Sequence, residues 1–143
     1  MNTVAQILGS KPDRAVYTME PTASAHDAVR LMVDKNIGAL VVVERGQVVG
    51  IVSERDYTRK IALQGRNSKE TRVAEIMTAD VFTVAPTTRT RACMTLMSEK
   101  KIRHLPVVDG DTVLGMISIR DIMDDIIADH EATIAQLETY IQS

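Results

Sequence analysis

The sequence is poor in the residues that build several kinds of site. Of its 143 residues, one is cysteine, none is tryptophan and 3% are aromatic. A single cysteine, Cys93, excludes an internal disulfide and any metal site built on several cysteines, and it hints at the reducing cytoplasm. Because aromatic residues are so few, aliphatic residues and methionine must fill the core, and we expect Cys93 to lie there as a small apolar residue.

Long basic runs and long apolar runs are also missing. The net charge is −2, and no segment is strongly basic, so generic binding to nucleic acid or to an anionic membrane is not expected. No apolar run reaches the roughly 18 residues that a membrane span needs. Met1–Lys11 lacks the basic start and apolar core of a signal peptide. These absences predict a cytoplasmic protein with no membrane association.

What the sequence does contain is an internal repeat. Residues 16–56 overlay on residues 81–121 at a constant offset of 65, without a gap. Upstream, Val4–Leu8 resembles Val73–Met77 at a slightly larger offset. Two units are too few for a solenoid, so we predict a pseudo-two-fold pair around one core. Identical residues align at Val16/Val81, Thr18/Thr83, Pro21/Pro86, Leu31/Leu96, Met32/Met97, Leu40/Leu105, Gly50/Gly115, Ser53/Ser118, Arg55/Arg120 and Asp56/Asp121.

Each repeat has the pattern strand, helix, strand, strand, helix, which predicts an α/β (α+β) fold. In the first copy Ala15–Thr18 is extended, and a helix follows with Ser24 as its cap. Ala39–Glu44 and Val48–Val52 form a hairpin, and Ser53 begins a second helix that runs through Leu63. Continuous apolar strands of this kind are typical of sheets that helices cover, so the two motifs should pack through their sheets.

The predicted boundaries place a first motif at 4–63, a polar linker at 64–70, a second motif at 71–127 and a helical extension at 128–143. Apolar residues recur in the tail at helical spacing over about twenty residues. Two interpretations remain open: this face packs on the protein's own sheet, or it docks on a second subunit. The residues are Ile122, Ile126, Ile127, Ile134, Leu137 and Ile141.

Two phrases that could bind a ligand are Gly50–Asp56 and Gly115–Asp121, each of which has Ser, Arg and Asp in the same places. Each lies where a strand passes into a helix, whose free N–H groups and partial positive charge suit a phosphate. The carboxylate can accept hydrogen bonds from a ribose diol. The alternative is a plain helix cap, since Ser-x-x-Asp is a capping pattern. A cap does not require Arg55 or Arg120, which favours the binding role.

The whole repeat resembles a tandem pair of CBS motifs, the regulatory domains of the cystathionine β-synthase type. The resemblance extends from about Val4 to Ile126. Besides the two Ser-x-Arg-Asp phrases, the segments that carry it are Val16–Pro21, Val81–Pro86, Asn36–Val43 and Lys101–Val108.

The family implies a cleft with two related sites for AMP, ADP, ATP, NAD(H) or S-adenosylmethionine. It assigns the ribose to Asp56 and Asp121, with Ser53 and Ser118 assisting. The residues implied at the adenine and its surroundings are Thr18, Met19, Ile37, Gly38, Ala39, Thr83, Val84, Ile102 and Pro106. The residues implied at the phosphates are Arg55, Arg120, Arg103 and His104.

The two copies differ at these places, since Arg103-His104 in the second copy corresponds to Gly38-Ala39 in the first, and Pro106 to Val41. One site is therefore expected to bind phosphate well, and the other poorly or with a different ligand. His104 has a plainer interpretation, as a neutral residue that opens a strand.

The resemblance favours an adenine-nucleotide-binding regulatory module that forms a homodimer and acts on a separate enzyme or transporter. The alternative is a ligand-free scaffold for dimerisation or for interaction with a partner. An enzyme is not expected, because the sequence lacks His-x-x-x-His, paired cysteines, Gly-x-Ser-x-Gly and the Gly-x-x-x-x-Gly-Lys loop. No catalytic residue, metal or required cofactor is predicted.

Overall fold

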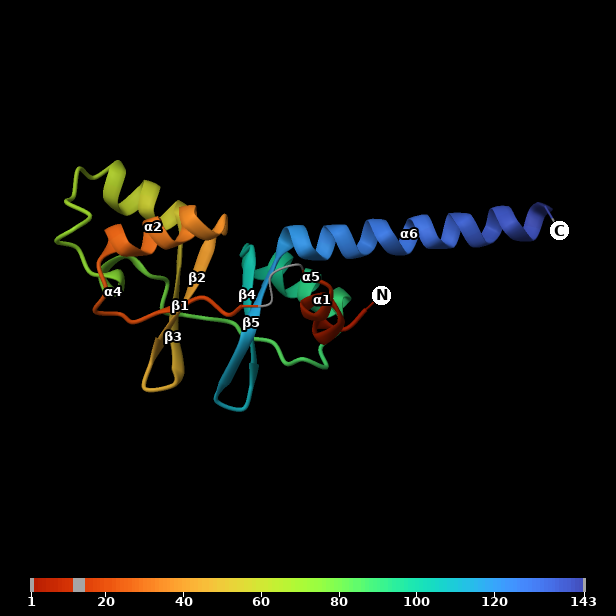
Figure 1. Ribbon diagram of the computed structural model, residues 1–143, viewed down its shortest axis with the longest axis horizontal. Coiled ribbons are helices and arrows are strands. Elements are labelled where there is room, and N and C mark those ends of the chain that lie inside the picture. The colour runs from red at the N-terminus through yellow and green to blue at the C-terminus, as the bar shows by residue number, and fades with distance from the viewer. Residues whose placement is uncertain (1, 12–14, 143) are drawn as a thin grey trace.

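The computed structural model describes residues 2–11 and 15–142, which form two similar halves around two small sheets (Figure 1). Strands β3 and β5 bring the sheets into contact, and helices cover their outer sides. This arrangement confirms the predicted α+β pair of motifs. The first sheet has the order β1-β2-β3 and the second pairs β4 with β5. The strands are β1 (Thr18–Met19), β2 (Ala39–Glu44), β3 (Gln47–Ser53), β4 (His104–Asp109) and β5 (Thr112–Ser118).

The hairpin of the first sheet has the predicted strands. Strand β2 has the predicted bounds, and β3 is one residue longer at each end than the predicted Val48–Val52. Arg45 and Gly46 connect them with φ values of 52° and 79°, as in a two-residue hairpin turn of the primed type. The predicted extended piece Ala15–Thr18 is only partly correct. Pairing with β2 begins at Thr18, which lies opposite Val41 in parallel.

The second sheet repeats this register with one strand less. His104 lies opposite Ser118, as Ala39 lies opposite Ser53, and both hairpins carry a bulge at the same place. The counterpart of β1 is a single parallel bridge between Val84 and Val107.

The long helices of the two motifs are buried in the same way, but only the first has a side-chain cap at its N-terminus. Helix α2 (Ala25–Lys35) starts at Ser24, whose Oγ accepts the Asp27 N–H at 3.0 Å, as predicted. Helix α5 (Thr90–Lys100) is its counterpart and buries Cys93, which confirms the core position of that residue. Each helix therefore covers its sheet with one apolar face.

The helix predicted from Ser53 to Leu63 forms only partly as expected. It starts as α3 (Glu54–Tyr57) and continues as a π-helical turn, η1 (Thr58–Ala62). The wider turn buries Ile61 in the first core while Lys60 reaches the Ile76 carbonyl at 2.8 Å. The expectation of a regular helix to Leu63 was wrong for this last part.

Two short helices are exchanged between the halves. Helix α1 (Val4–Ser10) precedes the first motif in sequence, but Val4 and Ile7 belong to the core of the second half. Helix α4 (Val73–Ile76) precedes the second motif, and its apolar residues belong to the core of the first half. Each half therefore completes its core with a segment that leads into the other.

Helix α6 (Ile119–Gln142) begins in the second core and then extends away from the body (Figure 1). Ile122 is fully buried and Ile126 packs beside the same core. The expectation that the tail packs on its own sheet holds for these two residues. It was wrong for Ile127, Ile134, Leu137 and Ile141, because each of these side chains is more than half exposed.

Candidate functional site

A cavity of about 610 Å³ lies between the halves, within the usual size range of small-molecule sites. The first half contributes the end of β3, the start of α3 and part of η1. The second half contributes residues 78–82 and 101–104. The lining residues are Gly38, Ile51, Ser53, Glu54, Arg55, Asp56, Arg59, Lys60, Thr78, Asp80, Val81, Phe82, Lys101, Ile102, Arg103 and His104.

Ser53 and Asp56 form a reciprocal cap at the edge of this cavity. Asp56 Oδ2 accepts the Ser53 N–H at 2.9 Å, and Ser53 Oγ accepts the Asp56 N–H at 3.2 Å. The capping interpretation is therefore confirmed for this copy. It leaves room for a ligand, because Asp56 Oδ1 pairs with Lys60 Nζ at 3.4 Å and a carboxylate offers about four acceptor positions.

The cavity carries more positive than negative side chains. Five lining residues are Lys or Arg and three are acidic, Glu54, Asp56 and Asp80. Fixed cations around a space partly shielded from water attract an anion more strongly than the same charges do on an open surface. The lining cations are Arg55, Arg59, Lys60, Lys101 and Arg103.

His104 is half-buried at the back of this cavity. Burial lowers the pKa of the imidazole below 6.5, the positive charges of Lys11 and Arg103 act in the same direction, and Asp121 opposes them. Gly38 lies opposite, and a Cβ there would be 3.7 Å from His104 Nε2. Burial thus favours the neutral imidazole, and an arriving phosphate would favour its protonation.

The structure brings seven of the predicted site residues together in the cavity: Gly38, Ser53, Arg55, Asp56, Ile102, Arg103 and His104. It places the other predicted residues elsewhere. Thr18 and Met19 lie in β1, and Ile37 and Ala39 pack in the first core. Thr83 is exposed, while Val84 and Pro106 are buried in the second half. Ser118, Arg120 and Asp121 lie outside the lining of this cavity.

Nine lining residues were missed by the sequence reasoning, chiefly the stretch that follows α4. Thr78 reaches the site because its N–H and carbonyl pair with Ile51 at 2.8 and 3.0 Å. The similarity of Val73–Met77 to Val4–Leu8 was the signal that could have located this stretch. Phe82 aligns with Tyr17 in the repeat, and a lysine lies over each ring. Lys100 Nζ is 5.2 Å from the centre of the Phe82 ring, and Lys35 lies over Tyr17. Phe82 supplies an aromatic ring to the cavity wall.

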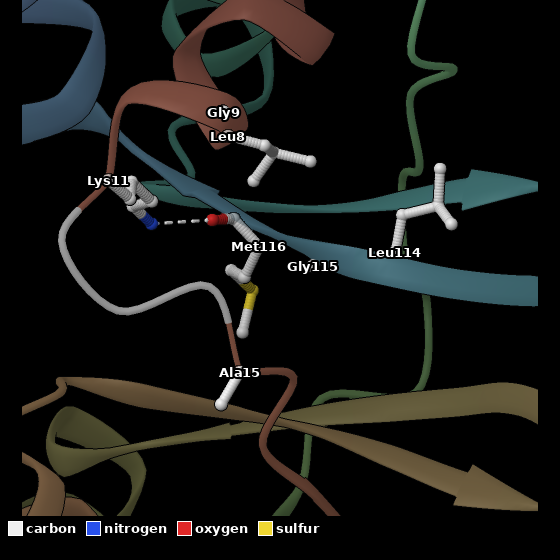
Figure 2. Close-up of a pocket in the computed structure, with 7 residues that line it drawn as sticks. All are labelled: Leu8, Gly9, Lys11, Ala15, Leu114, Gly115 and Met116. Carbon is white, nitrogen blue, oxygen red and sulfur yellow. Dashed lines mark hydrogen bonds between the residues drawn. The ribbon is translucent and has the colours of Figure 1, made fainter.

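A second pocket, of about 200 Å³, lies beside β5 and is lined by residues from α1, Lys11, Ala15 and β5 (Figure 2), which is below the usual size of ligand sites. Gly115 and Met116 of the second phrase line it, whereas Ser118, Arg120 and Asp121 do not. Lys11 Nζ donates to the Met116 carbonyl at 2.9 Å and lies 3.0 Å from Asp121 Oδ2. Asp121 has the same reciprocal cap with Ser118 as Asp56 has with Ser53, at 2.8 and 3.2 Å. The copies differ in the lysine beside the carboxylate, which is Lys11, directly after α1, for Asp121 and Lys60 of η1 for Asp56.

Comparisons with known proteins agree with this architecture. A family model described as the CBS domain matches residues 4–63 and 73–128. The CBS domain-containing protein CBSX3, mitochondrial, of Arabidopsis thaliana is 43% identical over 124 residues, which cover 83% of the chain and 60% of that protein. The chain therefore spans about 60% of the length of this relative.

Solved structures show the same fold. A protein with CBS domains from Burkholderia ambifaria is 53% identical, with a TM-score of 0.84, and the match covers 90% of this chain and 96% of that one. A CBS domain pair solved in complex with 5′-methylthioadenosine and S-adenosyl-L-methionine is 28% identical, with a TM-score of 0.78 and coverage of 90% and 98%.

No helix in residues 2–11 and 15–142 is long and apolar enough to cross a membrane. No group of three or more His, Cys, Asp or Glu side chains in them could hold a metal ion.

Proposed function

Because the chain belongs to the CBS-domain family as a tandem pair, we propose that it is a regulatory module that binds an adenine nucleotide between its halves. The observation that carries the proposal is the cavity of about 610 Å³ in which the Ser53–Asp56 pair faces an excess of cations. The related domain pair that was solved with two adenosine-containing ligands supports it. We assign no catalytic step to the site, and its effect would be exerted through ligand-dependent contacts.

The charge of the cavity favours ligands with phosphates, namely AMP, ADP, ATP or NAD(H), over S-adenosylmethionine. The sulfonium of S-adenosylmethionine is positive, and five lining cations would repel it. In this proposal Asp56 accepts the ribose hydroxyls and Arg55, Arg103 and His104 contact the phosphates. Ile102 and Phe82, rather than the more distant Thr18 or Thr83, would pack on the base.

Asp56→Asn tests the site, because it removes the charge while an amide oxygen can still cap α3. Losing charge-assisted hydrogen bonds worth about 1.5–3 kcal/mol should weaken binding roughly tenfold to a hundredfold. Calorimetry with AMP, ADP, ATP, NADH and S-adenosylmethionine measures this. Asp121→Asn is the matched control and should change the affinity by less than about twofold. Equal affinities in wild type and Asp56→Asn would refute the assignment.

We also propose that one nucleotide binds per chain, because Lys11 occupies the acceptor groups of the second copy. Lys11→Ala frees Asp121 and the Met116 carbonyl, so a second, weaker binding event should appear in calorimetry. Lys60→Ala removes the equivalent cation beside Asp56 and should weaken the single event without adding another. If Lys11→Ala leaves the stoichiometry at one, the lysine does not close the second pocket.

A ligand-free scaffold is the alternative, and the exposed apolar residues of α6 favour it as a second candidate. The outcomes differ, since a scaffold would show no heat or thermal shift with any of the five ligands. In either case the module would act as a homodimer on a regulated enzyme or transporter. We place it in the cytoplasm, which fractionation of cells that produce the tagged protein would test.

A further inference from the structure

Helix α6 carries a row of large apolar side chains that the body leaves uncovered. Each is more than half exposed, and the most distal, Ile141, is 80% exposed. Most of the stability of a helix in a protein comes from packing of its apolar face against another element. The row therefore needs a cover over most of its length. Its members are Met123, Ile127, Ile134, Leu137 and Ile141.

The spacing of this row identifies the kind of cover. From Met123 the positions follow at intervals of four, three, four, three and four residues, with His130 filling the one place that is not apolar. This is the 3.5-residue repeat of a coiled coil, whose partner is another helix with the same repeat. In heptad terms Ile127, Ile134 and Ile141 occupy the a positions.

The body of the protein does not obstruct this row of apolar side chains, which forms the seam of the coiled-coil pattern. Ile122 and Ile126 mark the face of α6 that packs on the second core. At 100° per residue the seam lies about a quarter turn away from that face. Met123 and Ile127 consequently stay 54% and 53% exposed, although they lie beside residues that contact the body. A second helix can follow the seam from Met123 to Ile141.

We propose that α6 pairs with α6 of a second copy in a parallel, in-register, two-stranded coiled coil. Isoleucine at the a positions, with leucine and methionine at d, favours two parallel strands. In that arrangement Ile127, Ile134 and Ile141 each meet their own counterpart. The sequence contains no Lys or Arg beyond Arg120, which disfavours an anionic membrane as the cover.

Charge selects the parallel direction. The e positions of the heptad are Asp124, Glu131 and Glu138, all acidic. An antiparallel pair would place these two rows against each other, and like charges would repel. A parallel pair places each acidic residue beside a g position of the other copy, such as Ile126 or Thr133, where there is no like charge.

Sedimentation equilibrium of the full chain tests the pairing. Ile127→Glu combined with Ile134→Glu puts charges into two layers, and dimerisation should weaken roughly a hundredfold or more. Ala128→Glu combined with Ala132→Glu adds the same charge outside the seam and should leave the dimer intact. His130→Leu completes the apolar row and should tighten it. A monomeric wild type, or a seam variant that dimerises like wild type, overturns the proposal.

Oxidation of Leu137→Cys tests the direction. In a parallel pair the two sulfurs face each other and form an intermolecular disulfide, whereas in an antiparallel pair residue 137 lies opposite residue 127, about 15 Å away. Wild type, whose Cys93 is buried, is the control and should not cross-link. If the Leu137→Cys protein is a dimer that fails to cross-link, the parallel arrangement is wrong. If the full chain is a monomer that instead binds another protein through these apolar residues, the pairing itself is wrong.

Discussion

At the scale of the residue, His104 connects the two pockets. It lines the large cavity, while Lys11, which lines the small pocket, and Asp121, the ion-pair partner of Lys11, both act on its pKa. The sequence alone identified His104, Arg103 and Asp56 as candidates because they differ between the copies or belong to a motif. It did not identify Phe82 or Asp80, because these belong to a stretch whose position depends on where α4 packs.

The lowered pKa of His104 predicts a dependence of stability on pH. The folded protein disfavours the charged imidazole, so its contribution is complete above the unfolded pKa near 6.5 and is lost as the pH falls through the lower folded value. The unfolding free energy should fall between pH 7 and pH 5, by at most about 1.4 kcal/mol per pH unit.

Thermal unfolding of His104→Gln at several pH values checks this expectation. The variant should lose the part of the dependence that comes from the imidazole. His26→Gln, in the first turn of α2, is the matched substitution at a histidine outside the cavity. A His104→Gln curve parallel to wild type would show that another group titrates.

At the scale of the element, the hairpins were predicted almost residue by residue and the helices less well. Ala39–Glu44 is a continuous apolar run next to a turn-forming Arg45-Gly46 pair, so local sequence determines it. The π-helical turn Thr58–Ala62 was missed because it depends on Lys60 and Ile61 reaching different neighbours, which are distant in sequence. Periodicity cannot reveal such a tertiary requirement.

The approach of the exchanged helices to the strands predicts different tolerances at two aligned glycines. A Cβ at Gly50 would lie 2.6 Å from Met77 Sδ and 3.0 Å from the Thr78 carbonyl oxygen. That oxygen is backbone and already accepts the Ile51 N–H. Gly50→Ala should therefore cost about 1–3 kcal/mol.

Gly115→Ala is the matched variant for urea unfolding. Its Cβ would meet only the flexible end of Leu8, at 3.0 Å, so the loss of stability should be smaller. Equal losses at the two positions would contradict the difference in packing.

At the scale of the whole molecule, the exchange of α1 and α4 predicts that neither half folds alone. A fragment of residues 1–66 lacks Val73 and Ile76, and a fragment of residues 67–143 lacks Val4 and Ile7, all of which are core residues. Each fragment should show no cooperative unfolding by circular dichroism. A cooperative transition in the isolated second fragment would contradict this.

The exchange itself could not be read from the sequence. Val4–Leu8 and Val73–Met77 look alike, and their similarity is the same whichever half each one joins. The duplication therefore predicted two halves but not which segment completes which core. The placement of Thr18 and Thr83 near the adenine came from the family resemblance and stays a prediction, while residues 78, 80, 81 and 82 line the cavity.

The crossed packing also sets the order in which a ribosome can deliver a finished molecule. The first core is complete once α4 has emerged. The second needs α1, made before both motifs, to meet β5 and α6, made after the whole first half, and Asn2 and Asp125 are joined by a hydrogen bond across 123 residues. During synthesis α1 must remain undocked until β5 appears, so a helix made before both motifs is among the last elements to pack.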